Sequence, residues 1–335
     1  MANKNLRNAK AAKNDEFYTQ LADIEKELGH YKDQFKNKVV FCNCDDPTWS
    51  NFWKYFALNF DFFGLKKLIA THYRYDGQPS YKLEISADNP NSKLVPVKTT
   101  LIGNGDFRSD ECVEILKEAD IVATNPPFSL FREFIAQLIE HNKTFVVIGN
   151  QNAISCKEIF SLLKNNLIWI GNSYPKEFIQ PCGSIKKFGN ICWFTNMEIK
   201  KRHDNLPLYR SYNEKDYPKY DNYDAINIDK IKDIPADYAG NMGVPITFML
   251  KYNPEQFEVI ALGMVGSIEF DCNKKMEILD KKTGASTGKY TNNAKGKLYR
   301  LYNPVTDKTP TFRNVETGEL YSSIYGRIII RNKTL

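Results

Sequence analysis

A tetrapeptide suited to an uncommon kind of chemistry, Asn125-Pro126-Pro127-Phe128, directly follows the apolar segment 120–124. The Asn125 side-chain oxygen and the Pro126 carbonyl oxygen can each accept one N–H hydrogen bond. Proline restricts the backbone, so both oxygens can point the same way without reorganisation. Two such acceptors suit a planar exocyclic amine, because they favour a tetrahedral nitrogen with a localised lone pair, and Phe128 offers a ring for base stacking. We therefore predict methyl transfer to a ring amine, with these four residues as the catalytic group; the alternative is an ordinary loop opened by Asn-Pro.

The elements around this tetrapeptide alternate between short apolar runs and helical periodicity. This alternation predicts an α/β fold with a doubly wound sheet through about residue 200. Strands are expected at 39–44, 67–71, 99–102, 120–124, 144–148, 167–170 and 191–194, and helices at 23–35, 49–58, 111–118 and 131–140. Ligands in such sheets bind outside the carboxyl ends of the strands. The polar residues at those ends are therefore expected to share one crevice.

Length and composition exclude several other classes of protein. The chain has 335 residues, 42% hydrophobic and 26% charged, which suits a folded chain of about two domains. No apolar stretch is long enough for a membrane span and no signal peptide is visible, so a cytoplasmic location without a membrane partner is expected. Seven scattered cysteines indicate neither a disulfide framework nor a metal site.

The net charge of +6 is unevenly distributed along the chain. Residues 1–13 hold four basic residues and no acids, and residues 274–335 hold 13 basic and 5 acidic residues. Basic ends on a more acidic body suggest a polyanionic partner. After about residue 204 tyrosine and lysine become frequent, so we predict a basic arm at 1–13, a first domain at 14–204 and a second, mixed domain at 205–335.

Several segments together resemble a known family, the EcoRI-type adenine-specific DNA methyltransferases. Besides the tetrapeptide, the likeness lies in segments 15–20, 42–47, 103–107, 243–248 and 252–257, and it covers most of the chain. The resemblance implies a Rossmann-like, doubly wound methyltransferase sheet with a smaller C-terminal domain that recognises DNA. It also implies that S-adenosylmethionine donates the methyl group to adenine N6 of a base flipped out of double-stranded DNA. A companion restriction endonuclease acting on the same site is a further implied partner.

The resemblance assigns the first cofactor residues to a segment before the sheet. Phe17, Tyr18 and Thr19 are expected over the methionine end of the cofactor. The alternative for Thr19 is an ordinary helix N-cap.

The turn after the first strand is expected to hold the cofactor as well, through Asn43, Asp45, Asp46 and Pro47. Asp45, Asp46 and Pro47 stand where the wider class of methyltransferases has glycines. Asp45 or Asp46 is expected to pair with the cofactor's ammonium group. The alternative is that one of the two acids caps the helix that begins near Trp49.

A third cofactor contact is expected at Asp106, beside Phe107, where the carboxylate would accept from the adenine amine of the cofactor. Its alternative is a turn aspartate after glycines. Many related sites hold ribose hydroxyls with an acid after the second strand. Here that strand runs into Thr71-His72-Tyr73, so the ribose contact stays unassigned.

Contacts with DNA are expected outside the sheet. A basic stretch interleaved with glycine and asparagine suggests a flexible loop that orders on a duplex. Its expected phosphate and base contacts are Lys281, Lys282, Lys289, Lys295, Lys297 and Arg300. Phe188 is expected to pack on the flipped base, or else to be a core aromatic residue.

Three other functions remain open from the residues. Cytosine-N4 methyltransferases more often have Ser or Asp before Pro-Pro, so Asn125 argues against that activity. Glutamine-N5 protein methyltransferases share Asn-Pro-Pro but end it with Tyr and lack a basic C-terminal domain. A DNA-binding module that has lost catalysis is suggested only by the missing glycine-rich turn.

Overall fold

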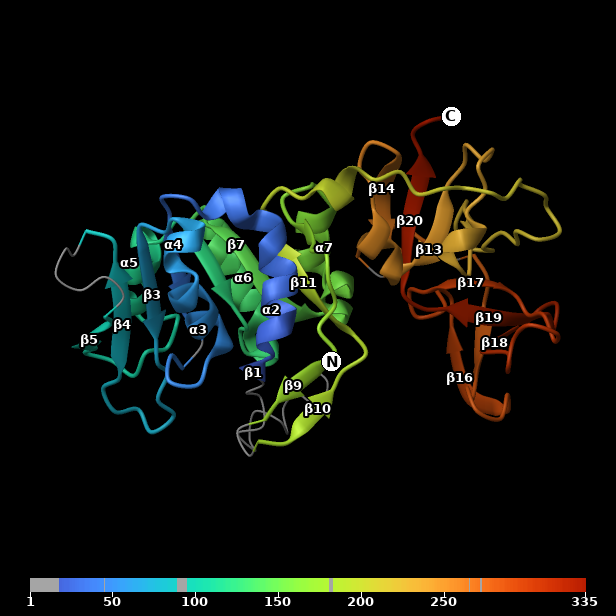
Figure 1. The fold of residues 1–335 in the computed structure, drawn as a ribbon. Coiled ribbons are helices and arrows are strands. Elements are labelled where there is room, and N and C mark those ends of the chain that lie inside the picture. The colour runs from blue at the N-terminus through green and yellow to red at the C-terminus, as the bar shows by residue number, and fades with distance from the viewer. Residues whose placement is uncertain (1–17, 45, 89–94, 181–182, 265, 272) are drawn as a thin grey trace. The chain divides into compact units, whose positions relative to one another are not determined.

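The chain divides into two units in a computed structural model, Met1–Ile199 and Lys200–Leu335 (Figure 1). The structure describes residues 18–44, 46–88, 95–180, 183–264, 266–271 and 273–335. The basic arm 1–13, Phe17 and Asp45 lie outside the described residues. Within the described part, no helix is both long enough and apolar enough to cross a membrane.

An eight-stranded sheet forms the centre of the first unit, in the order β5-β4-β3-β2-β6-β7-β11-β8. The strands β2, β3, β6 and β7 run parallel, whereas β4, β5 and β11 pair antiparallel with their neighbours. Parallel strands are covered on both faces, which explains why they read as continuous apolar runs. The bounds are β2 Val39–Cys42, β3 Lys67–Thr71, β4 Tyr81–Ser86, β5 Val97–Thr100, β6 Ile121–Thr124, β7 Thr144–Asn150, β8 Trp169–Ile170 and β11 Ile191–Thr195.

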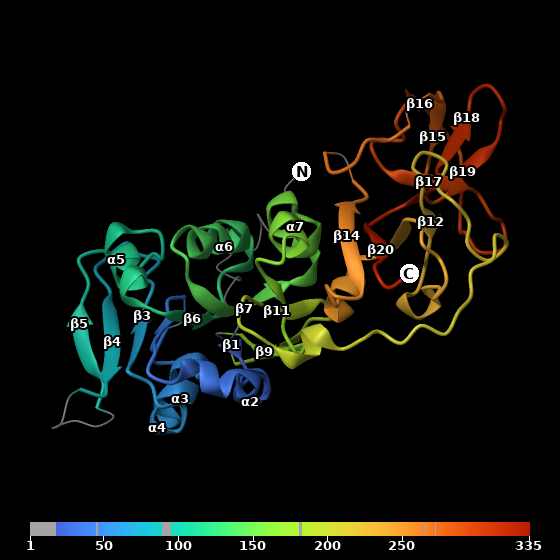
Figure 2. The same ribbon diagram turned by 90° about the horizontal axis from the view of Figure 1, so that it is seen from above.

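Helices cover both faces of this sheet (Figure 2). One face carries α2 (Leu21–Leu28), α3 (Asn51–Leu58) and α4 (Phe60–Phe63). The opposite face carries α5 (Asp110–Glu118), α6 (Phe131–Glu140) and α7 (Lys157–Lys164). The predicted α/β class is therefore confirmed.

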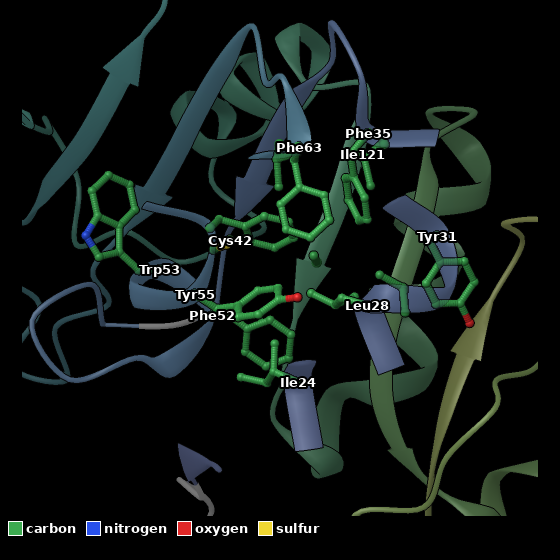
Figure 3. Packing of buried hydrophobic residues seen from close by; sticks show 14 of the residues in the cluster. Ile24, Leu28, Tyr31, Phe35, Cys42, Phe52, Trp53, Tyr55, Phe63 and Ile121 are labelled. Carbon is green, nitrogen blue, oxygen red and sulfur yellow. The ribbon is translucent and has the colours of Figure 1, made fainter. Parts of the chain in front are cut away.

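Aromatic side chains fill the layer between the sheet and α2, α3 and α4 (Figure 3). The Phe35 ring meets the Phe63 ring edge-on at 5.2 Å, and the Tyr55 ring lies 5.7 Å from Phe63. Buried aromatic pairs of this kind contribute beyond the apolar area they cover. They fix α3, and with it the turn that precedes it, against β2.

Two expectations for the first unit need correction. The expected strand 99–102 is β5, Val97–Thr100, an exposed edge strand. It follows β4, Tyr81–Ser86, which was not predicted because it is only half-buried and is not a continuous apolar run. The expected helix 23–35 is α2 followed by a 3₁₀ helix, Gly29–Phe35.

A small antiparallel sheet completes the first unit. It joins β1 (Tyr18–Thr19), β9 (Glu177–Ile179) and β10 (Ile185–Lys187). Further short 3₁₀ helices along the chain are Phe128–Leu130, Gln151–Ser155, Lys200–His203, Ile231–Asp233 and Ile246–Lys251.

The second unit contains a four-stranded and a five-stranded sheet. The first has the order β12-β13-β20-β14, with bounds Ile226–Asn227, Met242–Pro245, Arg327–Asn332 and Phe257–Leu262. The second has the order β16-β15-β18-β19-β17, with bounds Ser286–Thr291, Met276–Leu279, Phe312–Asn314, Leu320–Ile324 and Leu298–Leu301. The expectation that the basic stretch is a flexible loop is therefore wrong, because β15, β16 and β17 lie within it.

Candidate active site

The carboxyl ends of β2, β3 and β6 meet at one edge of the large sheet, which we call the carboxyl edge. Two hydrogen bonds tie the turn after β2 to the last residues of β3 and β6. The Cys44 backbone N–H donates to Thr124 Oγ1 at 3.3 Å, and Thr71 Oγ1 donates to the Asn43 carbonyl oxygen at 3.4 Å. The structure thus brings the turn after β2 beside the start of the Asn125-Pro126-Pro127-Phe128 tetrapeptide.

This tetrapeptide forms a corner between β6 and α6. Pro126 is buried, and Asn125 and Phe128 are partly exposed. Pro127, with φ −56°, leads into the 3₁₀ helix Phe128–Leu130, and its carbonyl oxygen accepts from the Leu130 N–H at 2.9 Å. The two prolines therefore fix the path of the chain where the strand ends, which holds the Asn125 backbone in place.

Phe128 and Phe188 lie close together although 60 positions separate them in the numbering. Their ring centroids are 6.3 Å apart with the planes at 81°, and Phe178 of β9 meets Phe188 at 5.5 Å. Lys186 Nζ lies 5.3 Å from the centre of the Phe188 ring. The third ring, Phe178, was not predicted as part of this group. In the sequence it is only one apolar residue in a short segment.

Thr19 lies in β1 beside these rings, paired with Phe178 in the strand register. Its carbonyl oxygen accepts from Asn51 Nδ2 at 2.7 Å, which ties β1 to the first turn of α3. The residue before α2 is Gln20, so the interpretation of Thr19 as the helix N-cap is wrong. Tyr18, its neighbour in β1, is partly exposed.

Two buried polar atoms near the carboxyl edge have no hydrogen-bond partner among the described residues. They are Thr19 Oγ1 and Asn43 Oδ1, on side chains that are both 2% exposed. An unpaired polar atom of this kind costs free energy unless a ligand or water satisfies it. These atoms mark places where a polar ligand group would be favoured.

The Asp46 carboxylate accepts hydrogen bonds within its own turn and also lies close to the residue that follows β3. Oδ1 accepts from the Thr48 N–H at 2.9 Å and from Thr48 Oγ1 at 2.7 Å. Oδ2 lies 3.4 Å from His72 Nε2, just beyond β3. Ser50, not Asp46, caps α3 through bonds to Phe52 and Trp53, so the helix-cap alternative is wrong for Asp46. Pro47 is buried beneath this turn.

The Gly103–Phe107 segment packs against the residues that follow β3. Gly105 has φ +80°, and a Cβ at this position would lie 1.9 Å from the His72 carbonyl oxygen, so only glycine fits. The Asp106 carboxylate accepts from Arg108 Nε at 2.9 Å and Nη2 at 2.7 Å. Phe107 is 5% exposed and packs edge-on against Phe134 of α6, so this ring belongs to the core.

His72 stands in a network that the sequence did not reveal. Its Nδ1 lies 2.8 Å from Ser80 Oγ, and its ring stacks on Tyr81 with centroids 5.1 Å apart. Ser80 directly precedes β4, the strand that was not predicted, and Tyr81 is its first residue. No group of three or more metal-ligating side chains exists among the residues that the structure describes.

A separate basic region lies on the five-stranded sheet of the second unit. Lys281, Lys282, Lys289 and Lys295 are exposed there, and none has a carboxylate partner within the described residues. Partial burial, followed by the charges of Lys281 and Lys295, lowers the pKa of Lys297. We call Lys281, Lys295 and Lys297 the basic cluster. Two lysine charges close enough to Lys297 to lower its pKa favour an anionic ligand at this place.

Arg300 was expected among the DNA contacts, and the structure corrects this expectation. Its side chain is 6% exposed and makes two bonds to Asp307, Nη1–Oδ2 at 3.0 Å and Nη2–Oδ1 at 2.7 Å. Asp307 also accepts from Ser322 Oγ at 2.7 Å. Arg300 is therefore part of the internal structure of this sheet.

Comparison with known proteins places these features in a family. The family model described as "Adenine-specific methyltransferase EcoRI" matches residues 5–333. The chain is 49% identical to Type II methyltransferase M.EcoRI of Escherichia coli, over 77% of this chain and 89% of that protein. It is 44% identical to Type II methyltransferase M.MgeORF184P of Mycoplasma genitalium, with 75% and 84% covered, and 42% identical to Type II methyltransferase M.MpnI of Mycoplasma pneumoniae, with 75% and 83% covered.

No solved structure matches the chain. The family match spans both units, and the relatives are aligned over most of their own lengths. The resemblance seen in the sequence is thereby confirmed, and an adenine-specific family leaves no support for the cytosine-N4 and glutamine-N5 alternatives. The chain belongs to the EcoRI family of adenine-specific methyltransferases.

Proposed function

We propose that this adenine-specific DNA methyltransferase binds S-adenosylmethionine at the carboxyl edge and methylates N6 of an adenine that has left the duplex. The observation that carries the proposal is the hydrogen bond from the Cys44 backbone N–H to Thr124 Oγ1, 3.3 Å long, beside the Asn125–Phe128 corner. It puts the turn suited to the cofactor next to the two oxygens suited to the amine. Ligands of doubly wound sheets bind at this kind of edge.

The residues at the carboxyl edge fit such a cofactor. S-adenosylmethionine carries an ammonium, a carboxylate and two ribose hydroxyls, all of which form hydrogen bonds. The buried Thr19 Oγ1 and Asn43 Oδ1 lack partners among the described residues, and Asp46 offers a partly exposed carboxylate. The sulfonium of the bound cofactor supplies an activated methyl group, so the protein has to supply position and charge complementarity.

The corner would hold the target amine through its own oxygens. Asn125 Oδ1 and the Pro126 carbonyl oxygen would each accept one N6 hydrogen, which favours the nucleophilic form of the nitrogen. Phe128 and Phe188, 6.3 Å apart, offer aromatic surfaces for a base outside the stack. Asp106 and Tyr18 remain proposed cofactor contacts, with Asp106 shared with Arg108.

The second unit would bind the DNA backbone. The basic cluster, Lys282 and Lys289 supply cations that have no carboxylate partner among the described residues. DNA phosphates would neutralise the repulsion between these charges. We accordingly propose a Rossmann-like catalytic domain at 14–204 and a DNA-recognition domain at 205–335. The relatives are named Type II methyltransferases, so we propose that a companion restriction endonuclease acts on the same site and that the enzyme works in the cytoplasm.

Methylation of a plasmid tests this proposal. The purified protein is incubated with unmethylated plasmid and S-adenosylmethionine, and modified bases are mapped by sequencing that detects N6-methyladenine. We expect N6-methyladenine at one recurring sequence and no modified cytosine. A reaction without added cofactor is the control. Modified cytosine, or no modification, would overturn the proposal.

A further inference from the structure

The residue after β3 in this chain is His72, at a place where doubly wound sheets that bind ribose commonly supply an acid. Its environment is well defined. Ser80 Oγ lies 2.8 Å from His72 Nδ1 and 2.7 Å from the His72 carbonyl oxygen. A serine hydroxyl has a single proton. Both contacts are hydrogen bonds only if Ser80 donates to the carbonyl oxygen and accepts from Nδ1–H.

This arrangement selects the tautomer of the histidine ring. In the neutral ring this arrangement places the proton on Nδ1 and leaves Nε2 as a hydrogen-bond acceptor, whereas in the protonated ring Nε2–H would face Asp46 Oδ2. Nε2 lies 3.4 Å from Asp46 Oδ2, which is a second acceptor. Both side chains are 24% exposed, so a ligand can reach these atoms. Two acceptors side by side complement a group that has two neighbouring O–H donors.

We propose that His72 Nε2 and Asp46 Oδ2 together accept the two hydroxyl protons of the cofactor ribose. In many doubly wound sheets the two oxygens of a single acid accept these protons. Here one acceptor comes from the residue after β3 and the other from the turn after β2. This inference rests on the proposed use of S-adenosylmethionine at the carboxyl edge.

Three neighbours hold the pair in place. Stacking on Tyr81 at 5.1 Å fixes the plane of the His72 ring. The Gly105 backbone lies against the His72 carbonyl oxygen, and Thr48 binds the other oxygen of Asp46 at 2.7 Å. Each acceptor therefore has a fixed position before any ligand binds, which lowers the entropic cost of binding.

Titration calorimetry with modified ligands tests the inference. The ligands are S-adenosylhomocysteine, which does not react, and its 2′-deoxy and 3′-deoxy forms. The variant His72→Phe keeps a ring to stack on Tyr81 but removes the acceptor, and Asp46→Asn changes the other acceptor. His30→Phe, at an exposed histidine of the same unit, is the matched control. Thermal melting of each variant monitors folding.

We expect His72→Phe to weaken binding of S-adenosylhomocysteine by about three- to tenfold, the effect of one lost hydrogen bond. The His72→Phe variant should bind one of the two deoxy ligands as tightly as it binds S-adenosylhomocysteine, because the acceptor of the missing hydroxyl is already gone. The Asp46→Asn variant should likewise bind the other deoxy ligand as tightly as S-adenosylhomocysteine. Equal losses for all three ligands, or no loss, would overturn the inference while leaving the cofactor proposal intact. Failure of the unaltered protein to bind S-adenosylhomocysteine would overturn both.

Discussion

At the scale of single residues, the function depends on where two oxygen atoms lie. Asn125 and Pro126 directly follow the buried strand β6, and the proline ring limits how far the backbone can relax around them. An acceptor held in this way acts mainly when the nitrogen changes its geometry, so its loss should affect the rate more than binding.

The variant Asn125→Ala should therefore lower kcat by about a hundredfold or more, the usual effect of losing one fixed transition-state hydrogen-bonding group. The dissociation constant for DNA should change by less than about twofold, because backbone contacts dominate affinity. Single-turnover methylation and fluorescence anisotropy measure the two quantities. Asn165→Ala, just after α7, is the control. Unchanged turnover would exclude the proposed role of Asn125.

Prediction from sequence was most successful for residues at the ends of parallel strands. Asn43, Asp46 and Asn125 follow apolar runs, and the parallel order of β2 and β6 alone brings them to one edge. His72 follows the same rule, but its role depends on Ser80 and Tyr81. These residues introduce β4, which alternates apolar and polar positions and escapes a search for continuous apolar runs. Arg300 could not be separated from the lysines, because its pairing with Asp307 depends on the folded loop.

At the scale of elements, one buried carboxylate anchors α2 to the rest of the first unit. Glu27 is 0% exposed and accepts from Tyr31 Oη at 2.7 Å and from the backbone N–H groups of Asn172 at 2.8 Å and Ser173 at 2.6 Å. The loop 171–173 leads towards β9, which carries Phe178. The carboxylate thus links the helix after β1 to the segment before the aromatic rings.

The variant Glu27→Ala should reduce the free energy of unfolding by about 3 kcal/mol, because two backbone N–H groups lose their acceptor in a buried place. Urea unfolding followed by tryptophan fluorescence measures the change. Glu25→Ala, at an exposed position of the same helix, should change it by less than about 0.5 kcal/mol. Equal effects of the two variants would show that Glu27 does not anchor the helix.

A second element-scale prediction concerns acid stability of the five-stranded sheet. Burial by itself would raise the pKa of Asp307, but hydrogen bonds from Arg300, Ser322 and the Asn303 backbone lower this pKa below its ordinary value. The stabilisation is therefore present above the ordinary aspartate pKa of about 3.9 and is lost as pH falls through the lower, folded-state pKa.

We expect Asp307→Asn to be less stable than the unaltered protein near neutral pH, with the difference shrinking as the pH falls below about 4. Urea unfolding at a series of pH values measures this. Asp204→Asn, at an exposed position of the same unit, should show no such convergence. A difference that stays constant down to about pH 3 would contradict the role given to the Arg300–Asp307 pair.

The elements themselves were predicted best where the sequence pattern is local. Strands β3 and β6 and helix α6 follow from apolar runs or helical periodicity with bounds within a residue or two. The basic stretch was misjudged for two reasons. Strand β16 is exposed and polar, and β15 and β17 are buried segments of only four residues. Their pairing also joins segments far apart in the chain.

At the scale of the whole molecule, the excess positive charge of the C-terminal part should set the strength of DNA binding. The basic cluster gathers Lys281 from one turn, Lys295 from another and Lys297 from just after that second turn, and Lys295 has φ +57°, in the left-handed region that a lysine seldom adopts. Strained backbone of this kind is found more often at functional sites than elsewhere.

Replacement of Lys281, Lys295 and Lys297 by glutamine should weaken DNA binding and flatten its dependence on salt. Each lost phosphate contact lowers the slope of log affinity against log salt by about 0.9, so a decrease of about 2.7 is expected. Anisotropy titrations across salt concentrations measure the slope. Glutamine at Lys36, Lys54 and Lys66, exposed lysines of the first unit, should leave the slope unchanged. An unaltered slope in the first variant would remove the cluster from the interface.

The most direct test of the account is the structure of a ternary complex with S-adenosylhomocysteine and a duplex that contains the methylated sequence. We predict that the target adenine lies outside the base stack, with its N6 about 3 Å from both Asn125 Oδ1 and the Pro126 carbonyl oxygen. An adenine that remains stacked in the duplex, or an N6 atom remote from these two oxygens, would contradict the central claim.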